Sequence, residues 1–129
     1  MKVAVSSLGQ DLDAQLDLRF GRCAYFLIVD TDTMAFEVID NAAAGAAGGA
    51  GIQAGQAVAN AGAKVVLTGN VGPNAFQTLS SMGLKIYTGL NGTVREVVEQ
   101  FKQGALKEVA DATVGSKAGM GGGGGGGRR

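Results

Sequence analysis

Two strand-like runs joined by a short polar link constrain the fold of this chain more than any other feature. Residues 24–30 form a continuous apolar run, Ala-Tyr-Phe-Leu-Ile-Val-Asp, which is the pattern of a buried strand. Residues 34–40 then alternate between apolar and polar side chains, as half-buried strands do. The link, Thr31-Asp32-Thr33, has the composition of a turn. The sequence therefore predicts a β-hairpin with antiparallel strands.

The segments around the hairpin predict three more strands and three helices in a fixed order. The strands are expected over 2–7, 64–68 and 84–88, and the helices over 52–62, 73–82 and 94–101. This order, βββαβαβα, contains strand–helix–strand units, whose parallel crossovers are right-handed. We therefore predict an α/β fold with a mixed five-stranded sheet and helices on its faces, in a ribonuclease-H-like arrangement.

The predicted topology brings several connections to one edge of the sheet. The first, third, fourth and fifth strands would end there, and the second would begin there. Open α/β sheets bind ligands at such a carboxyl edge. Three glycine-bearing segments should meet at it, namely residues 18–23, 45–51 and 69–74.

The first of these segments carries the strongest ligand-binding side chains. Arg19 and Arg22 flank Phe20 and Gly21, and guanidinium groups pair well with anions. Gly21 would let the backbone approach a ligand closely. The alternative is that both arginines pair with aspartates of residues 11–17 on a solvated surface, while Phe20 anchors the core.

The other two segments offer backbone N–H groups at helix starts. Gly48, Gly49 and Gly51 run into a predicted helix, whose positive end favours anions. Their spacing matches neither a dinucleotide fingerprint nor a P-loop, so a mobile loop is the alternative. The second segment contains Gly69, Asn70, Val71, Gly72 and Asn74. It can equally be an ordinary turn before a proline-initiated helix.

Composition excludes several classes of function. The chain has no histidine and a single cysteine, so a Ser-His-Asp triad and a multi-cysteine metal site within one chain are both impossible. The predicted first strand carries no carboxylate of the kind a two-metal nuclease needs. Cys23 is a weak metal-ligand candidate, and a buried structural thiol is the favoured interpretation. A binding or carrier protein is therefore predicted, not an enzyme.

Charge and hydropathy point away from nucleic acid and membrane partners. Eleven basic residues balance eleven acidic ones, whereas nucleic-acid binders are usually basic. No apolar run approaches the roughly 20 residues of a membrane span. The start of the chain is too quickly polar for a signal peptide, and a lone thiol suits a reducing compartment. We expect a cytoplasmic protein.

Glycine is concentrated at the end of the chain. Of 23 glycines, seven form the run 121–127, which Arg128 and Arg129 follow. Such a run can bury nothing and loses much entropy when it orders. We predict a domain over 1–110 and a flexible tail over 111–129, either a solvated end or a tether for a partner.

Four ordered motifs resemble one known family. They are residues 1–7, Arg19-Phe20-Gly21-Arg22-Cys23-Ala24-Tyr25-Phe26, Gly49-Ala50-Gly51-Ile52, and residues 67–76. Together they resemble the dinitrogenase iron–molybdenum cofactor biosynthesis family over about residues 1–108, and the 16–22 run is most similar to the branch of the molybdenum–copper "orange protein". The resemblance implies a ribonuclease-H-like fold that carries a preformed metal–sulfur cluster without turnover, with protein partners in cofactor assembly or a larger complex.

The resemblance also suggests how a cluster is held. Many family members carry histidine where this chain has Arg19, and that departure favours a cluster needing no protein ligand. A molybdenum–copper sulfide cluster, or an iron–molybdenum cofactor or its precursor, would be held by the two arginines, by N–H groups of the glycine segments, and by apolar contact with Phe20, Ile52 or Val71. Two alternatives remain: a binder of another small anion or a nucleotide, and a regulatory or scaffold module that docks a partner without a cofactor.

Overall fold

The computed structural model describes residues 1–45 and 49–108. Gly48 and the predicted tail over 111–129 lie outside the described residues, so the domain boundary at 110 stays a prediction. Within the described ranges the elements are β1 (Lys2–Ser7), β2 (Tyr25–Asp30), β3 (Phe36–Asp40), the short 3₁₀ helix η1 (Ala42–Gly45), α1 (Ala50–Asn60), β4 (Val65–Leu67), α2 (Pro73–Ser81), β5 (Lys85–Tyr87) and α3 (Val94–Lys102).

The strands form one mixed sheet in the order β3-β2-β1-β4-β5. The predicted hairpin is confirmed: β2 pairs antiparallel with β3, and also with β1 on its other side. The β1–β4 and β4–β5 pairs are parallel, as the strand–helix–strand units require. The predicted mixed five-stranded α/β fold is therefore confirmed, while its ribonuclease-H-like label stays a prediction.

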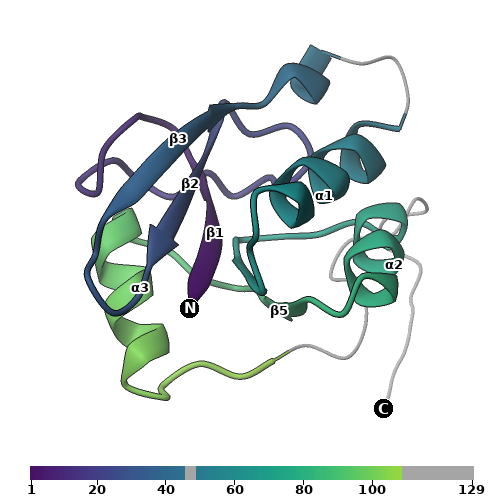
Figure 1. Ribbon diagram of the computed structural model, residues 1–129. Helices are drawn as coiled ribbons and strands as arrows, with labels where there is room; N and C mark the ends of the chain where they lie inside the picture. The colour runs from purple at the N-terminus through teal and green to yellow at the C-terminus, as the bar shows by residue number, and fades with distance from the viewer. Residues whose placement is uncertain (46–48, 109–129) are drawn as a thin grey trace.

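Two hydrophobic cores lie on opposite faces of the sheet because strand side chains alternate between faces. On one face, α1 and α2 cover a core that includes Ala4, Phe26 and Val66. On the other, α3 covers a core that includes Val5 and Leu67 (Figure 1). The buried residues of α3, which are Val94, Val97 and Val98, lie on one side of the helix.

The long connection between β1 and β2 packs over the start of α3. The backbone N–H groups of Val94 and Arg95 donate to the carbonyls of Ala14 and Leu12, at 2.9 and 2.8 Å. These two hydrogen bonds tie the connection to the start of α3. No helix within the described ranges is long and apolar enough to cross a membrane.

Candidate functional site

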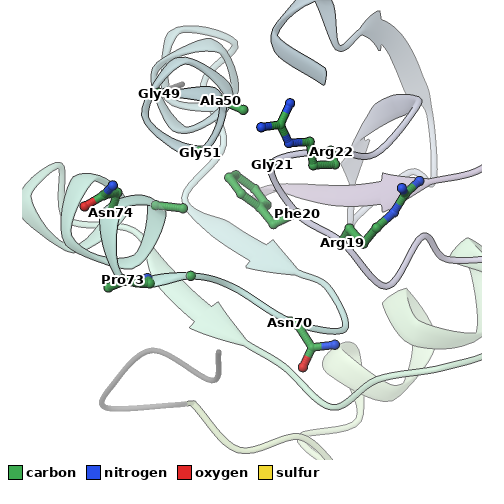
Figure 2. Close-up of a pocket in the computed structure, with 12 residues that line it drawn as sticks. Arg19, Phe20, Gly21, Arg22, Gly49, Ala50, Gly51, Asn70, Pro73 and Asn74 are labelled. Carbon is green, nitrogen blue, oxygen red and sulfur yellow. The ribbon is translucent and has the colours of Figure 1, made fainter. Parts of the chain in front are cut away.

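A pocket of about 440 Å³ lies at the carboxyl edge of the sheet (Figure 2). It opens between the turn that precedes β2, the start of α1 and the start of α2. Its walls combine arginine and asparagine side chains with an aromatic ring and small residues, and no carboxylate is among them: Arg19, Phe20, Gly21, Arg22, Gly49, Ala50, Gly51, Asn70, Gly72, Pro73, Asn74 and Ala75. Such a lining favours an anionic ligand.

Two helix starts face this pocket without a side-chain cap. Gly49 precedes α1 and Gly72 precedes α2, and neither helix has an acidic residue in its first turn. The first N–H groups of a helix have no partner within the helix, and its N-terminus carries about half a positive charge. By contrast, α3 satisfies its own start with a capping box between Thr93 and Glu96. The N-terminal backbone N–H groups of α1 and α2 are thus available to an anion.

The turn before β2 supplies the floor and one wall of the pocket. Phe20 is buried, and its ring packs against Phe26 with ring centroids 5.0 Å apart. Arg22 extends toward the first turn of α1 in Figure 2, and its Nη1 donates a hydrogen bond to the carbonyl of Ala44 at 2.7 Å. The predicted core role of Phe20 is confirmed, and the residue lines the pocket as well.

Arg19 is held differently from Arg22. Its Nε and Nη2 donate to the two carboxylate oxygens of Asp17, each at 3.2 Å, and its backbone N–H donates to the same carboxylate at 3.0 Å. Asp17 is 3% exposed, whereas the Arg19 side chain is 65% exposed. The Asp17 hydrogen bond, followed by its charge, raises the pKa of Arg19. For Arg19 the structure therefore contains the alternative arrangement, in which the arginine pairs with one of the aspartates of residues 11–17.

Small residues let the walls of the pocket come together. A Cβ atom on Gly51 would lie 2.9 Å from the Cβ of Ala75, and one on Gly21 would lie 3.2 Å from the Cα of Gly51. A Cβ on Gly69 would lie 2.7 Å from the Cα of Leu18. Gly21, Gly51 and Gly69 are thus needed for close backbone approach, which brings the two helix starts beside the turn.

Cys23 is a buried thiol behind the pocket wall. It is fully buried, and burial raises its pKa to about 12, with the charge of Asp17 adding to the effect. A thiol with this pKa is protonated at neutral pH and is neither a nucleophile nor a ready metal ligand. The favoured interpretation of a structural cysteine agrees with these surroundings.

The structure brings most of the predicted site residues to this one pocket. Those that line it are Arg19, Phe20, Gly21, Arg22, Gly49, Gly51, Asn70, Gly72 and Asn74. Gly69, Val71 and Ile52 do not line it: Gly69 and Val71 are buried, and Ile52 is 37% exposed on the outer side of α1. Sequence reasoning missed Ala50, Pro73 and Ala75 as lining residues, although their places at the two predicted helix starts could have indicated them.

The described residues contain no group of three or more histidine, cysteine or carboxylate side chains that could hold a metal ion. The donor set of the pocket is instead guanidinium, amide and backbone N–H. These groups fit a ligand that brings its own negative surface, and they do not fit a bare metal cation, which needs acceptor ligands.

The fold is an α/β domain, and the pocket at the carboxyl edge of its sheet has hydrogen-bond donors suited to a small anion. The profile of one family, described as dinitrogenase iron-molybdenum cofactor, matches residues 1–104. The chain belongs to this family, as its motifs predicted. Family membership connects it with metal-cofactor binding and biosynthesis.

Solved structures and a sequence relative agree with this assignment. The chain is 45% identical to the orange protein of Desulfovibrio gigas, solved in its apo form, with a TM-score of 0.85 over 87% of this chain and 95% of that one. A Thermotoga protein provisionally named NifB is 38% identical, with a TM-score of 0.76 over 87% and 96%. An uncharacterised protein of Methanocaldococcus jannaschii is 27% identical over 84% of this chain and 95% of its own length. The predicted resemblance to the orange-protein branch is confirmed.

Proposed function

We propose that this protein is a non-catalytic carrier of a preformed anionic metal–sulfur cluster, bound without covalent bonds in the pocket at the carboxyl edge. The cluster is of the molybdenum–copper sulfide type, or an iron–molybdenum cofactor or precursor. The observation that carries the proposal is the convergence of two uncapped helix starts and Arg22 on a pocket without carboxylates. Similarity to the orange protein and membership of the cofactor family support it.

The chemistry of the pocket favours a sulfide-covered cargo. Inorganic sulfide already saturates the metals of such a cluster, so the protein need not supply thiolate or imidazole. Backbone N–H groups of Gly49, Ala50 and Gly51, and those of Gly72, Asn74 and Ala75, would donate weak hydrogen bonds to the sulfides. The apolar walls formed by Phe20 and Pro73 would face the soft, weakly hydrated sulfide surface. Hydrogen bonding and burial of this kind tune ordinary metal–sulfur sites.

The role of a carrier follows from what the pocket residues can do. Arg19, Arg22, Asn70 and Asn74 are its polar side chains, and none of them is a general base or a nucleophile at neutral pH. These side chains can bind and release an anion, but they do not transfer protons at neutral pH. A carrier must also hand over its cargo, so partners in cofactor assembly are part of the proposal.

A titration under anaerobic conditions tests this function. Metal-free protein is mixed with tetrathiomolybdate and cuprous ion, the visible spectrum is recorded, and molybdenum and copper are measured after gel filtration. We expect new absorption bands and stoichiometric retention. Arg22→Gln should weaken retention by about tenfold, a loss of about 1.4 kcal/mol. Arg95→Gln makes the same charge change at an exposed position of α3, away from the pocket. This matched control should bind cargo like the wild type.

Loss of retention in a folded wild-type protein would overturn the molybdenum–copper assignment. Retention of iron–molybdenum precursors by the same protein would then place the cargo in the other cluster type. Failure of both would leave a regulatory or scaffold module that docks a partner without a cofactor. That alternative predicts complex formation that survives pocket variants and is lost when residues 111–129 are deleted.

A further inference from the structure

Asn41 joins the turn that carries Arg22 to a neighbouring segment outside the pocket lining, and it lines no part of the pocket itself. It directly follows β3 and directly precedes η1, and it is half-buried. One of the two segments is the turn before β2, and the other is η1, which leads toward α1. A residue between them can fix their relative position.

The side-chain amide of Asn41 holds the turn from behind. Its Nδ2 donates to the carbonyl of Gly21 at 3.0 Å and to the carbonyl of Cys23 at 2.9 Å. The same nitrogen lies 3.7 Å from the sulfur of Cys23. An amide nitrogen carries two N–H groups, so one side chain can serve both carbonyls. The two carbonyl groups on either side of Arg22 are thereby satisfied inside the protein and away from an anionic ligand.

The backbone of Asn41 links this turn to η1. Its carbonyl accepts a hydrogen bond from the N–H of Ala44 at 3.1 Å. The carbonyl of Ala44 in turn accepts the hydrogen bond from Arg22 Nη1 at 2.7 Å. Gly21 is thus bonded to Asn41, Asn41 to Ala44, and Ala44 to Arg22, which follows Gly21 in the chain. Together these links form a closed ring that includes the Arg22 guanidinium.

We propose that Asn41 is a positioning residue that holds Arg22 in place for the anionic cargo. The inference rests on the proposed carrier function and adds a residue that contacts no ligand. Asparagine suits this role because it is short and donates twice. Aspartate has the same size but no N–H group when ionised, and it would set a negative charge against two carbonyl oxygens.

The test compares Asn41→Ala and Asn41→Asp with the wild type and with Asn60→Asp. Asn60 is exposed at the far end of α1, so its variant controls for the added charge. Retention of molybdenum and copper after anaerobic loading is measured first. The rate of Cys23 alkylation by iodoacetamide, without cargo and well below the unfolding midpoint, is measured second. We expect about tenfold weaker retention in both Asn41 variants, about tenfold faster alkylation in Asn41→Ala, and no change of either in Asn60→Asp.

A double-mutant cycle separates positioning from a purely structural role. If Asn41 acts through Arg22, then Asn41→Ala costs much less affinity in the Arg22→Gln background than alone. Equal losses in both backgrounds would overturn the inference, as would wild-type retention by a folded Asn41→Ala. Failure of the wild type itself to bind cargo would instead overturn the proposed function. In that event unchanged alkylation of Asn41→Ala would also show that Asn41 does not hold the turn.

Discussion

At the scale of single residues, Arg19 and Arg22 carry the same charge in different surroundings. Arg19 neutralises the buried carboxylate of Asp17, whereas Arg22 bonds a backbone carbonyl beside a helix start. A guanidinium paired with a carboxylate has less electrostatic attraction left for a ligand. For the proposed anionic cargo we therefore expect Arg22 to contribute more of the binding energy, and Arg19 more of the stability of the turn.

The pairing of Arg19 with Asp17 predicts that Arg19→Gln lowers the thermal stability of the fold. Arg19→Gln leaves the Asp17 carboxylate buried without its guanidinium, so it should lower the midpoint of thermal unfolding by several degrees. The double variant Asp17→Asn/Arg19→Gln removes the uncompensated charge and should recover most of the loss. Differential scanning calorimetry at neutral pH measures both. A midpoint for Arg19→Gln equal to that of the wild type would show that the pair does not stabilise the fold.

Cys23 predicts a pH dependence of stability. Its pKa rises from 9.0 to about 12 in the fold, so the unfolded chain releases this proton first as pH increases. The thiol's stabilising contribution is complete below about pH 9 and declines between about pH 9 and 12. Urea unfolding across this range should therefore show a steeper loss of stability in the wild type than in Cys23→Ala. Parallel pH profiles would contradict the assignment.

At the scale of elements, α1 and α2 place their starts side by side because Gly51 leaves room for Ala75. Gly51→Ala would bring two Cβ atoms within 2.9 Å, so the helices must shift. We expect a loss of about 1–3 kcal/mol in unfolding free energy, together with weaker cargo retention. Gly45→Ala is the control, since a Cβ there meets nothing within 4 Å. Equal stability of the two variants in urea would contradict this packing.

The start of α3 makes a contrasting prediction. Thr93 accepts a hydrogen bond from the Glu96 N–H at 3.1 Å, and the Glu96 carboxylate accepts one from the Thr93 N–H at 2.8 Å. Thr93→Ala should cost about 1 kcal/mol of stability. Because α3 covers the other face of the sheet, cargo retention by the folded variant should equal that of the wild type. Weaker retention would place α3 in the site.

The elements were predictable from sequence where a local signal defines them. A continuous apolar run indicated β2, alternation of apolar and polar side chains indicated β3, and Pro73 indicated the start of α2. The pocket was predictable less fully, because position along a loop does not fix which way a side chain points. Ile52, next to Gly51 in sequence, lies outward on α1.

Asn41 could not be predicted from sequence as part of the site. Its hydrogen bonds reach Gly21 and Cys23, which lie 20 and 18 positions away along the chain. No local sequence pattern indicates contacts between residues so far apart along the chain. These contacts form because the β2–β3 hairpin brings the chain back to the turn before β2. The packing of the whole sheet edge creates the role of this residue.

At the scale of the whole molecule, the balance of charge limits how salt can act. The formal net charge is zero, so the protein has no overall charge with which to attract an anionic cargo. Any salt dependence of binding must come from charges close to the pocket. Raising the ionic strength from about 0.01 to 1 M shortens the screening length from about 30 to 3 Å. Affinity for the cluster should fall over this range in the wild type.

The same reasoning predicts how the cargo stabilises the fold. A ligand that binds only the folded state adds about 2.7 kcal/mol at a free concentration 100 times its Kd. Thermal unfolding with excess tetrathiomolybdate and cuprous ion should therefore show a raised midpoint that declines as salt is added. In Arg22→Gln the midpoint shift should be smaller and less dependent on salt, since one of the two arginines that line the pocket is gone. A salt dependence in Arg22→Gln as steep as that of the wild type would show that the attraction arises elsewhere on the molecule.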